Sequence, residues 1–480
     1  MNIEVKLNRD QFLIITPEDS RLLNELYVYF SYDVEGAIFS QQYRSGIWDG
    51  KQHFFKYRNG DYYGRLAYGL LTELIKYTKL NNHKLIIDDG TLKLFTGELF
   101  NYADDMLKFK LRFYQKEAVD KALMRKKCIL RLCTSAGKSL IGAYLVKILS
   151  DNHKGNSIIV VPTKSLILQF YNDLIEYGID ASLIGKVYAD EKNFDRPYVI
   201  STWQTLINHL DKLKLFNCLI IDETHGVRGD ELYKITKNSH AEYKIGMTGT
   251  LPKSPIERLK IQSFLGPKVV DYSTAELSSH GYVSNCNIHR IIITYNSDFN
   301  YDYNQMKDVI YNNNYRRQLV RNIVNKVDSS CLILVDKVKK EGLTLFDYLK
   351  DKINKKLVFL SGKDNVKIRD MWRQECEASD NLCIIATYGI FSTGIDIKSL
   401  KYLLLYSNTK SEIRTLQSIG RALRLHESKI TTGAYIFDIV DILKYFEDHS
   451  IERLAYYEQE QFKVYDNHMI EGYPIEFTSF

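Results

Sequence analysis

The residues most suited to chemistry are Lys138 and Ser139, which follow Gly137 in the segment Leu-Cys-Thr-Ser-Ala-Gly-Lys-Ser (132–139). An apolar run precedes this loop of small residues, and residues 140–148 have the pattern of a helix. Backbone N–H groups at such a helix start bind phosphates, a lysine reaches the terminal phosphates, and a hydroxyl can bind Mg²⁺. The general pattern has glycine where Leu132 stands, so the match is partial, and an ordinary strand–turn–helix is the alternative.

A pair of carboxylates, Asp222 and Glu223, follows the apolar run 219–221. At the end of a strand in the same sheet, Asp222 would face the loop at Lys138, where Mg²⁺ needs a carboxylate ligand. Glu223 could orient or deprotonate the attacking water. His225 has no second histidine or cysteine at metal-binding spacing, so we expect it to couple nucleotide state to Thr248 and Thr250, with an uninvolved surface histidine as the alternative.

Two arginines near the C-terminal end form a second candidate group. Gln417, Arg421 and Arg424 have the spacing i, i+4 and i+7, which predicts one shared face of a helix. Arginines aimed together could stabilise the charge that develops on a γ-phosphate, whereas the alternative is a solvated basic face. Gly420 in mid-helix is costly unless another group approaches closely, and this favours a functional role.

The elements that must position these residues alternate between strand and helix. Apolar strands are predicted at 157–161, 198–201, 219–221 and 244–247, and a second round of the alternation begins near Asn287 with strands at 331–335, 357–360, 383–386, 402–405 and 435–437. Continuous apolar strands separated by helices indicate parallel sheets covered on both faces. Residues 273–285 are expected to link the two sheets, and a terminal helical region is expected past Asp441.

Residues 1–100 lack a phosphate loop and do not show the regular alternation of strands and helices that follows them. The pattern predicts a first strand or hairpin over residues 5–15, a helix through residues 22–30, a hairpin turn at Asp49-Gly50, a strand over 52–57, a helix over 69–80 and closing strands over 84–94. We therefore expect a small α+β module. Its turn mixes aromatic and basic groups, Arg44, Trp48, Lys51 and Arg58, as nucleic-acid contacts do; a core tryptophan with solvated charges is the alternative.

Length and composition limit the class of protein. The chain has 480 residues, enough for three domains of ordinary size, and we expect them at 1–100, 101–285 and 286–480. A hydrophobic content of 45% without a bilayer-length apolar run argues against a membrane protein, and the absence of a signal-peptide core predicts a cytoplasmic location. The seven cysteines are scattered, which predicts buried thiols. The net charge of +6 suits a nucleic-acid partner without requiring one.

Six segments together resemble the ordered motifs of superfamily 2 helicases. They are Phe113-Tyr114-Gln115, residues 135–139, residues 222–225, Thr248-Gly249-Thr250, residues 392–396 and residues 417–424. The chain is most similar to the phage UvsW-type helicases, whose N-terminal domain carries an Arg-x-Gly-x-Trp-Asp-Gly segment that Arg44 to Gly50 match. Two departures, Ser135 in place of glycine and Thr248-Gly249-Thr250 in place of Ser/Thr-Ala-Thr, keep small residues.

The resemblance implies a fold of two RecA-like parallel-sheet domains preceded by a small α+β DNA-binding domain, with ATP and Mg²⁺ as cofactors. It implies that Mg²⁺ is held by Ser139 and Asp222. It further implies that ATP is bound by Phe113, Gln115, Thr134, Ser135, Ala136, Gly137, Lys138, Ser139, Gly394 and Asp396, and that catalysis involves Lys138, Asp222, Glu223, His225, Gln417, Arg421 and Arg424. The nucleic-acid backbone would contact Pro162, Thr163, Gln169, Thr202, Gln204 and Thr393, beside Arg44, Trp48 and Lys51 of the N-terminal module.

The expected function is that of an ATP-dependent DNA helicase of 3′-to-5′ polarity. It would unwind or branch-migrate forked and four-way DNA in recombination, repair and replication restart, as UvsW-type enzymes do, in the cytoplasm of a host cell if the gene is a phage gene. Single-stranded and branched DNA are the expected partners, recombination or single-strand-binding proteins are further candidates, and a monomer is expected. The alternatives are a duplex translocase or RNA helicase with the same motor, and a DNA-binding scaffold with an inert ATP site.

Overall fold

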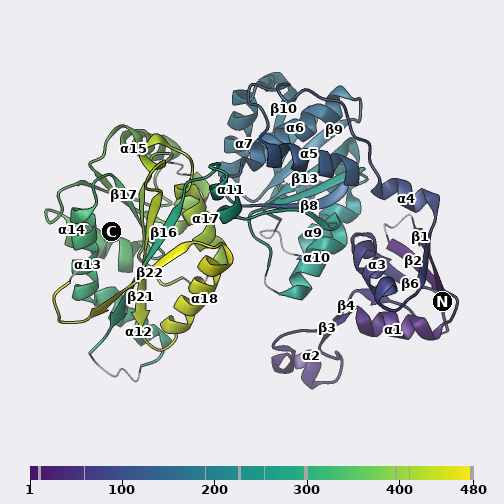
Figure 1. Ribbon diagram of the computed structural model, residues 1–480, viewed down its shortest axis with the longest axis horizontal. Coiled ribbons are helices and arrows are strands. Elements are labelled where there is room, and N and C mark those ends of the chain that lie inside the picture. Colours follow the sequence, from purple (N-terminus) through teal and green to yellow (C-terminus); the bar gives the residue numbers. More distant parts are fainter. Residues whose placement is uncertain are drawn as a thin grey trace. The chain divides into compact units, whose positions relative to one another are not determined.

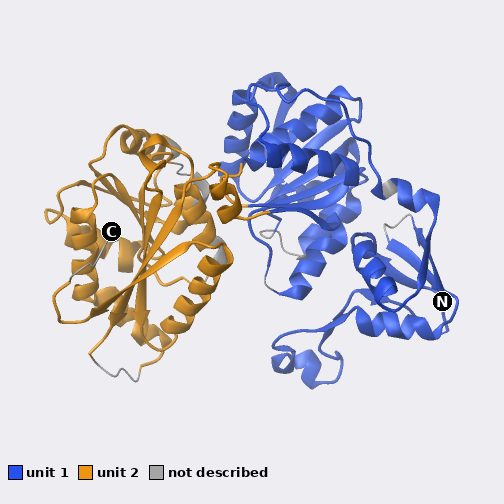
Figure 2. Cartoon of the chain, viewed as in Figure 1, with its two compact units in different colours: residues 1–132, 137–271 blue, residues 133–136, 272–480 orange. Residues whose placement is uncertain are grey.

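Three large β-sheets organise the chain in the computed structural model (Figure 1). The structure describes residues 1–8, 12–58, 60–189, 191–224, 229–252, 254–296, 301–394, 397–409 and 411–475. By contacts, the chain divides into a first unit of residues 1–132 and 137–271 and a second unit of residues 133–136 and 272–480 (Figure 2). No helix in the described part of the chain is long and apolar enough to cross a bilayer.

The first unit begins with a five-stranded sheet in the order β5-β6-β2-β1-β7. Its strands are β1 (Asn2–Leu7), β2 (Phe12–Pro17), β5 (Phe55–Lys56), β6 (Gly64–Ala67) and β7 (Lys84–Ile87), and its helices are α1 (Arg21–Tyr29), α3 (Leu71–Leu80) and α4 (Asp89–Phe95). Alternate residues of β1, β2 and β6 point inward onto α1 and α3, and the opposite face of the sheet is mixed, with charged residues such as Lys6 and Arg65 beside the apolar Phe12 and Ile14. The predicted α+β module of residues 1–100 is thus present.

An extension interrupts this module between α1 and β5. It consists of β3 (Ser31–Asp33), a 3₁₀ turn (Ala37–Phe39), α2 (Gln41–Arg44) and β4 (Lys51–His53), and Figure 1 shows it set apart from the five-stranded sheet. The prediction of a two-residue hairpin turn at Asp49-Gly50 is wrong, because β4 pairs with β3 rather than with a strand ending at Trp48. Gly50 instead adopts a positive φ of 81°, with the Tyr43 ring packed where a Cβ would lie.

The module packs directly on the sheet that follows it. Tyr68 donates a hydrogen bond from its hydroxyl to the Phe264 carbonyl oxygen, and a Cβ at Gly69 would lie 1.9 Å from the Gln262 carbonyl oxygen. The Tyr68 ring also covers two lysines, with Lys127 Nζ 4.4 Å and Lys244 Nζ 5.6 Å from its centroid. The N-terminal module is therefore built into the first unit rather than joined to it by a loose linker.

The second sheet has eight strands in the order β11-β10-β12-β9-β13-β14-β8-β15. Its central strands β10, β12, β9, β13, β14 and β8 are parallel, and β11 pairs antiparallel at one edge. The strands are β8 (Lys127–Leu132), β9 (Asn156–Val161), β10 (Ile184–Tyr188), β11 (Glu191–Lys192), β12 (Tyr198–Thr202), β13 (Phe216–Asp222), β14 (Tyr243–Thr248) and β15 (Lys268–Tyr272). The helices around it are α5 (Phe113–Arg125), α6 (Lys138–Asp151), α7 (Lys164–Glu176), α8 (Trp203–Leu206), α9 (Gly229–Asn238) and α10 (Pro255–Leu265).

The third sheet, in the second unit, has seven strands in the order β18-β19-β17-β20-β21-β16-β22, all parallel. They are β16 (Cys286–Thr294), β17 (Cys331–Val335), β18 (Lys356–Leu360), β19 (Leu382–Thr387), β20 (Tyr402–Leu405), β21 (Ala434–Ile442) and β22 (Lys463–Ile470). The helices of this unit are α11 (Thr274–Ser279), α12 (Tyr303–Asn312), α13 (Asn314–Lys326), α14 (Thr344–Leu349), α15 (Val366–Ala378), α16 (Tyr388–Gly394), α17 (Glu412–Ala422) and α18 (Phe446–Gln459).

Two further predictions differ from the structure. The closing strands expected over 84–94 stop at Ile87, because the Asp88 carboxylate accepts a hydrogen bond from the Thr91 N–H and starts α4. Residues 273–285, expected to link the two sheets, lie between β15 and β16 and contain the short helix α11. Among the described residues past Asp441, α18 is the helix; the chain then adds strand β22 beside β16, in which polar and apolar residues are equally frequent.

Candidate ATP site and nucleic-acid surface

The phosphate loop lies between β8 and α6, as predicted. Two residues of this loop have left-handed backbone conformations, Ser135 with a φ of 70° and Gly137 with a φ of 76°. Gly137 is the N-cap of α6, so the N–H groups of the first turn of this helix are available to an anion. The Gln115 amide nitrogen lies 2.5 Å from the position of a Cβ at residue 137, so a side chain there would collide with Gln115.

Gln115, predicted to bind adenine, is nearly completely buried beside this loop. Its Oε1 accepts a hydrogen bond from the Arg112 N–H at 2.9 Å, which fixes the side chain at the first turn of α5. Phe113, the first residue of α5, keeps 47% of its surface exposed and contacts Tyr114 edge to face. An exposed ring beside a fixed amide is a suitable arrangement for a nucleobase.

Lys138 lies between the loop and the carboxylates of β13. Its Nζ donates to the Leu132 carbonyl oxygen at 3.3 Å and lies 3.6 Å from Glu223 Oε1, and both side chains are largely buried. Glu223 itself has a φ of 49°, in the left-handed region that non-glycine residues seldom adopt. The sequence predicts that Asp222 faces Lys138; in the structure the carboxylate 3.6 Å from Lys138 Nζ is that of the next residue, Glu223.

Asp222 ends β13 and is 9% exposed. Burial and the neighbouring charge of Glu223 raise the pKa of the Asp222 carboxyl to about 7, although Lys138 opposes the change. Within the described part of the chain, Asp222 Oδ1 is buried and accepts no hydrogen bond. A buried carboxylate oxygen together with the Ser139 hydroxyl is a set of hard oxygen donors, so these residues fit Mg²⁺.

Tyr177 is a residue of this site that sequence reasoning missed. Its hydroxyl lies 2.8 Å from Ser139 Oγ, so the two share a hydrogen bond. Tyr177 follows α7 and is 38 positions from Ser139 in the chain, and no sequence pattern links them. Binding of Mg²⁺ by Ser139 would therefore compete with the Tyr177 hydroxyl.

Thr224 connects the carboxylates to the next strand. It is fully buried, and its methyl group lies 2.9 Å from the position of a Cβ at Gly246 in β14. At the end of β14, Thr248 Oγ1 donates to the Thr250 carbonyl oxygen and accepts from the Thr250 N–H at 3.3 Å. His225, the predicted coupling residue, lies outside the described residues, so the described part of this connection runs through Thr224.

The predicted nucleic-acid residues of the first unit gather at the ends of two paired strands. Thr202 and Val161 are partners at the ends of β12 and β9, and Thr163 and Thr202 are the N-caps of α7 and α8. Gln204 Nε2 donates to the Pro162 carbonyl oxygen at 3.1 Å. The structure therefore brings Pro162, Thr163, Thr202 and Gln204 together, whereas Gln169 lies half-buried further along α7.

The arginine group lies in the second unit and differs from its prediction. Gln417 and Arg421 are on α17, but the helix ends at Ala422, so Arg424 is not on the same helical face. The helix stops because the Ala422, Leu423 and Arg424 carbonyl oxygens accept hydrogen bonds from Lys429 Nζ, the Ser284 N–H and Ser284 Oγ. The Arg421 guanidinium lies 6.0 Å from the centre of the Phe391 ring.

Another group approaches Gly420 closely, as the position of this glycine in mid-helix predicts. A Cβ at residue 420 would lie 2.3 Å from the Thr134 Cβ, and Ser135 Oγ donates to the Gly420 carbonyl oxygen at 2.7 Å. Residues 133–136 group with the second unit for this reason. Of the remaining predicted residues, Gly394 ends α16, the Thr393 side chain is not described, and Asp396 lies outside the described residues.

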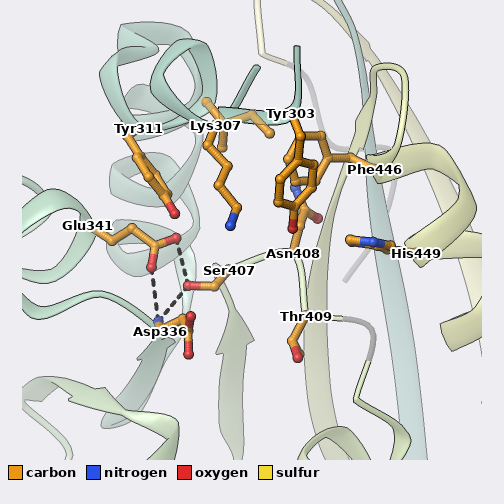
Figure 3. A pocket seen from close by; sticks show the side chains of 11 residues that line it. Tyr303, Lys307, Tyr311, Asp336, Glu341, Ser407, Asn408, Thr409, Phe446 and His449 are labelled. Atoms are coloured by element: carbon orange, nitrogen blue, oxygen red, sulfur yellow. Dashed lines mark hydrogen bonds between the residues drawn. The ribbon is translucent and has the colours of Figure 1, made fainter. Parts of the chain in front are cut away.

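A separate cavity of about 170 Å³ lies in the second unit between α12, β17, the loop after β20 and α18 (Figure 3). Tyr303, Tyr311 and Phe446 form its walls, and Lys307 points into it. Burial raises the pKa of Glu341 at its base, and this carboxylate already accepts hydrogen bonds from the Asp336 and Lys337 N–H groups and from Ser407 Oγ. Glu341 thus holds two loops together.

The loop that follows β20 is also held by two buried ion pairs. Arg453 Nε lies 3.0 Å from Asp438 Oδ2, and the same guanidinium donates to the Thr409 carbonyl oxygen at 3.0 Å. Arg316 Nε lies 3.1 Å from Asp441 Oδ1, and Asp441 also accepts from the Asn408 amide. Residues 407–409, which lead toward α17, are therefore fixed by the acidic residues of β21.

The N-terminal residues predicted to contact DNA mainly hold their own extension. Arg44 Nε donates to the Ile38 carbonyl oxygen at 3.2 Å, Trp48 Nε1 donates to the Lys51 carbonyl oxygen at 2.9 Å, and Lys51 Nζ lies 3.5 Å from Asp33. Trp48 is half-buried, which agrees with an anchoring role. The extension nevertheless exposes apolar side chains beside these cations, with Phe39 73% and Ile47 81% exposed.

Comparison with known proteins gives this geometry a family. Residues 2–88 match the model of the DNA helicase UvsW N-terminal domain, residues 108–253 that of the type III restriction enzyme res subunit, and residues 315–426 that of the helicase conserved C-terminal domain. The chain is 27% identical over 503 aligned residues to the ATP-dependent DNA helicase uvsW of Enterobacteria phage T4, with 96% of this chain and 98% of that protein covered.

Solved structures agree in fold. The crystal structure of T4 UvsW matches with a TM-score of 0.50 and 26% identity, covering 98% of this chain and 100% of that one. Dbp5 of S. cerevisiae, bound to RNA and ADP BeF3, matches with a TM-score of 0.52 over 76% of this chain and 91% of its own; at 13% identity this shows the fold alone. The chain is a superfamily 2 helicase, an ATP-dependent DNA helicase of the UvsW type with two RecA-like domains behind a UvsW-type N-terminal domain.

Proposed function

We propose that this helicase unwinds and branch-migrates forked or four-way DNA with 3′-to-5′ polarity, in recombination, repair and replication restart. The observation that carries the proposal is the N-terminal module, which packs on the first RecA-like domain through Tyr68 and Gly69. A motor that only follows one strand does not need such a module, whereas a motor that remodels a branch must hold a second part of its DNA. We further propose the domain division 1–100, 101–285 and 286–480.

The chain's own residues can perform the hydrolysis. Lys138 and the N–H groups at the start of α6 would hold the phosphates, and Gln115 would hold the base. Ser139 and Asp222 would hold Mg²⁺, which supplies charge neutralisation at the phosphates. Glu223, whose Oε1 lies 3.6 Å from Lys138 Nζ, would accept a proton from the attacking water. Arg421 and Arg424 would stabilise the charge developing on the γ-phosphate.

Contacts to the DNA strand would come from the ends of β9 and β12. Thr163 starts the 13-residue helix α7, whose N-terminal N–H groups favour a phosphate, and Gln204 is fixed against Pro162. Thr393, near the C-terminal end of α16, would contact the strand from the second unit. Phosphate contacts of this kind fix the position of the strand and carry no sequence preference.

The proposal is tested by ATPase and unwinding assays of the full chain on single-stranded, forked and four-way DNA and on RNA of matched sequence. We expect the highest turnover and strand displacement on branched DNA. Equal stimulation by linear duplex without displacement would indicate a translocase, and stimulation by RNA alone would indicate an RNA helicase. Absence of ATPase activity on every substrate would indicate a scaffold and would refute the motor.

The matched variant for the N-terminal part of the proposal is Arg44→Glu with Lys51→Glu. If the extension contacts a duplex arm, this pair should weaken binding of forked DNA at moderate salt and leave ATPase activity on single-stranded DNA unchanged. Unchanged processing of four-way junctions by this variant would show that the extension is a structural cap or a protein-docking element.

A further inference from the structure

A second group of cations in the N-terminal module lies on the five-stranded sheet and not on the extension. Lys56, Arg58 and Arg65 line a cavity of about 310 Å³ together with Tyr57, Asp61 and Tyr63. All three cationic side chains are exposed, and within the described part of the chain none of them forms an ion pair. Asp61 accepts a hydrogen bond from the Arg58 backbone N–H at 3.3 Å and is the one acidic side chain in the lining.

The strand register gathers positive charge here at a cost. Lys56 of β5 stands directly opposite Arg65 of β6, and Arg65 stands opposite Ile14 of β2, which in turn pairs with Lys6 of β1. Neighbouring strands are about 4.8 Å apart, so Lys56 and Arg65 repel each other across the sheet. A bound anion would offset this repulsion, and the solvent-facing side of the sheet thereby gains a function that its packing does not require.

Aromatic rings border the same cavity. Tyr57 and Tyr63 are half-buried in its wall, and Tyr62 packs edge to face on Tyr63 with ring centroids 5.5 Å apart. Tyr62 is 73% exposed. Cations that follow a phosphate backbone, combined with exposed rings on which bases stack, are the pattern of single-strand binding. Exposed rings can stack on unpaired bases, whereas the bases of a duplex already stack on one another, so these side chains suit an unpaired strand.

We infer that this cavity, lined by Lys56, Arg58 and Arg65, binds the phosphodiester backbone of an unpaired DNA arm and that Tyr62 stacks on one of its bases. The inference rests on the proposed action on branched DNA and gives the N-terminal module a defined ligand. One arm would be held on the sheet of this module while the strand-end loops of the motor hold another. The grip is electrostatic and independent of sequence.

The test is the salt dependence of DNA binding by the full chain, measured by fluorescence anisotropy with a labelled thymidine oligonucleotide and a blunt duplex of equal length. The variant is Lys56→Ala, Arg58→Ala and Arg65→Ala combined. Its matched control is Lys79→Ala, Lys84→Ala and Lys93→Ala, which removes the same charge from exposed positions at or beyond the opposite edge of the sheet. Thermal melting checks that both variants are folded.

The slope of log K against log salt is negative. Loss of three single-strand phosphate contacts should reduce its magnitude by about 2 for the oligonucleotide. Between about 50 and 200 mM salt, affinity of the intact chain should then fall about 16-fold more steeply than affinity of the variant. The control should keep the slope of the intact chain. Single changes, Lys56→Gln or Arg58→Gln, should each lower the slope by about 0.7 without a risk to folding.

Other results would overturn the inference. Equal slopes for the variant and the intact chain would show that the cavity does not bind DNA, and an equal loss in the control would show a general charge effect. If the magnitude of the salt slope fell by about 2.7 for the duplex and stayed unchanged for the oligonucleotide, the cavity would be assigned to paired DNA instead. Tyr62→Ala should weaken oligonucleotide binding without changing the slope, and Tyr62→Phe should restore it. Because these measurements need no turnover, they remain informative even if branched DNA fails to stimulate the ATPase.

Discussion

The two lysines beneath Tyr68 give a stability prediction that can be worked out in full. Lys244 is 1% exposed at the start of β14, where its Nζ donates to the Thr236 carbonyl oxygen at 2.9 Å. Burial, with a further contribution from the charge of Lys127, lowers the pKa of Lys244 to about 6, and burial lowers that of Lys127 to about 8. Both lysines lie where the N-terminal module meets the first RecA-like domain, so their charge state bears on that junction.

The sign follows from proton binding. Between pH 6 and 10.5 the unfolded chain binds a proton at Lys244 and the folded chain does not, so the stability of the protein rises with pH through this window. A pH of about 7.5 lies about three units below the pKa of this lysine in the unfolded chain. Folding must therefore remove its proton, which costs the folded state about 4 kcal/mol. Lys244→Met removes that cost and loses a hydrogen bond of about 1 kcal/mol, so the free energy of unfolding should rise by about 3 kcal/mol.

The assay is urea denaturation followed by tryptophan fluorescence. The chain has three tryptophans, of which Trp48 and Trp203 lie in the first unit and Trp372 in the second, so a Trp372→Phe background reports the first unit alone. The advantage of Lys244→Met should shrink by about 1.4 kcal/mol per pH unit and change sign near pH 10. A difference that stays constant from pH 6.5 to 9.5 would show that Lys244 is charged in the folded state and would refute the reasoning.

Three further predictions concern the motor. Lys138→Ala should abolish turnover by weakening ATP binding, whereas Glu223→Gln should bind ATP normally in a filter assay and hydrolyse it about 10²- to 10⁴-fold more slowly; near-normal DNA-stimulated ATPase in the latter would remove Glu223 from its role. Arg424→Ala should leave ATP affinity nearly intact and lower turnover about 10³-fold, and residues 1–285 alone should be almost inactive; full activity of either would leave the arginines as a basic surface. Arg453→Met leaves Asp438 buried without its cation and should lower the free energy of unfolding of the second unit by about 3–5 kcal/mol, seen as a fall in the thermal midpoint; Lys463→Met, an exposed change nearby in the chain, should have little effect.

The packing of the N-terminal module also changes how it should be studied. Removal of residues 1–100 would uncover Lys127 and Lys244 and the surface around Gln262, so loss of activity in such a truncation would not separate DNA binding from instability. Surface substitutions such as Lys56→Gln or Arg58→Gln avoid this difficulty, because both side chains are exposed.

The sequence was sufficient to predict those strands whose residues form a continuous apolar run. The strands at 331–335 and 402–405 were predicted to the residue, because each is a continuous apolar run buried on both faces. The placement of the carboxylate pair 222–223 beside the Lys138 loop also followed, since parallel strands bring their carboxyl ends to one edge of the sheet, although the residue beside Lys138 Nζ is Glu223 and not Asp222. These features depend on local pattern and on topology alone.

Features that depend on register or on distant contacts could not be predicted in this way. The opposition of Lys56 and Arg65 requires knowledge that β5 pairs with β6 in one register, and the contact of Ser139 with Tyr177 joins residues far apart in the chain. Strand β22 lies at the edge of its sheet and half of its residues are polar, so its pattern resembled a surface segment. Arg424 left its helix because distant Ser284 binds the final carbonyl groups.

The close fit of Gly69 on the Gln262 carbonyl has a mechanical consequence. A module held this tightly would move with the first RecA-like domain as a rigid body, without displacement of one relative to the other. Any DNA arm attached to the five-stranded sheet would then be pulled through the same distance as that domain in each cycle of ATP hydrolysis. The amount of branch drawn in per cycle would be set by the stroke of the motor, as in a rigid lever, and not by the elasticity of a tether.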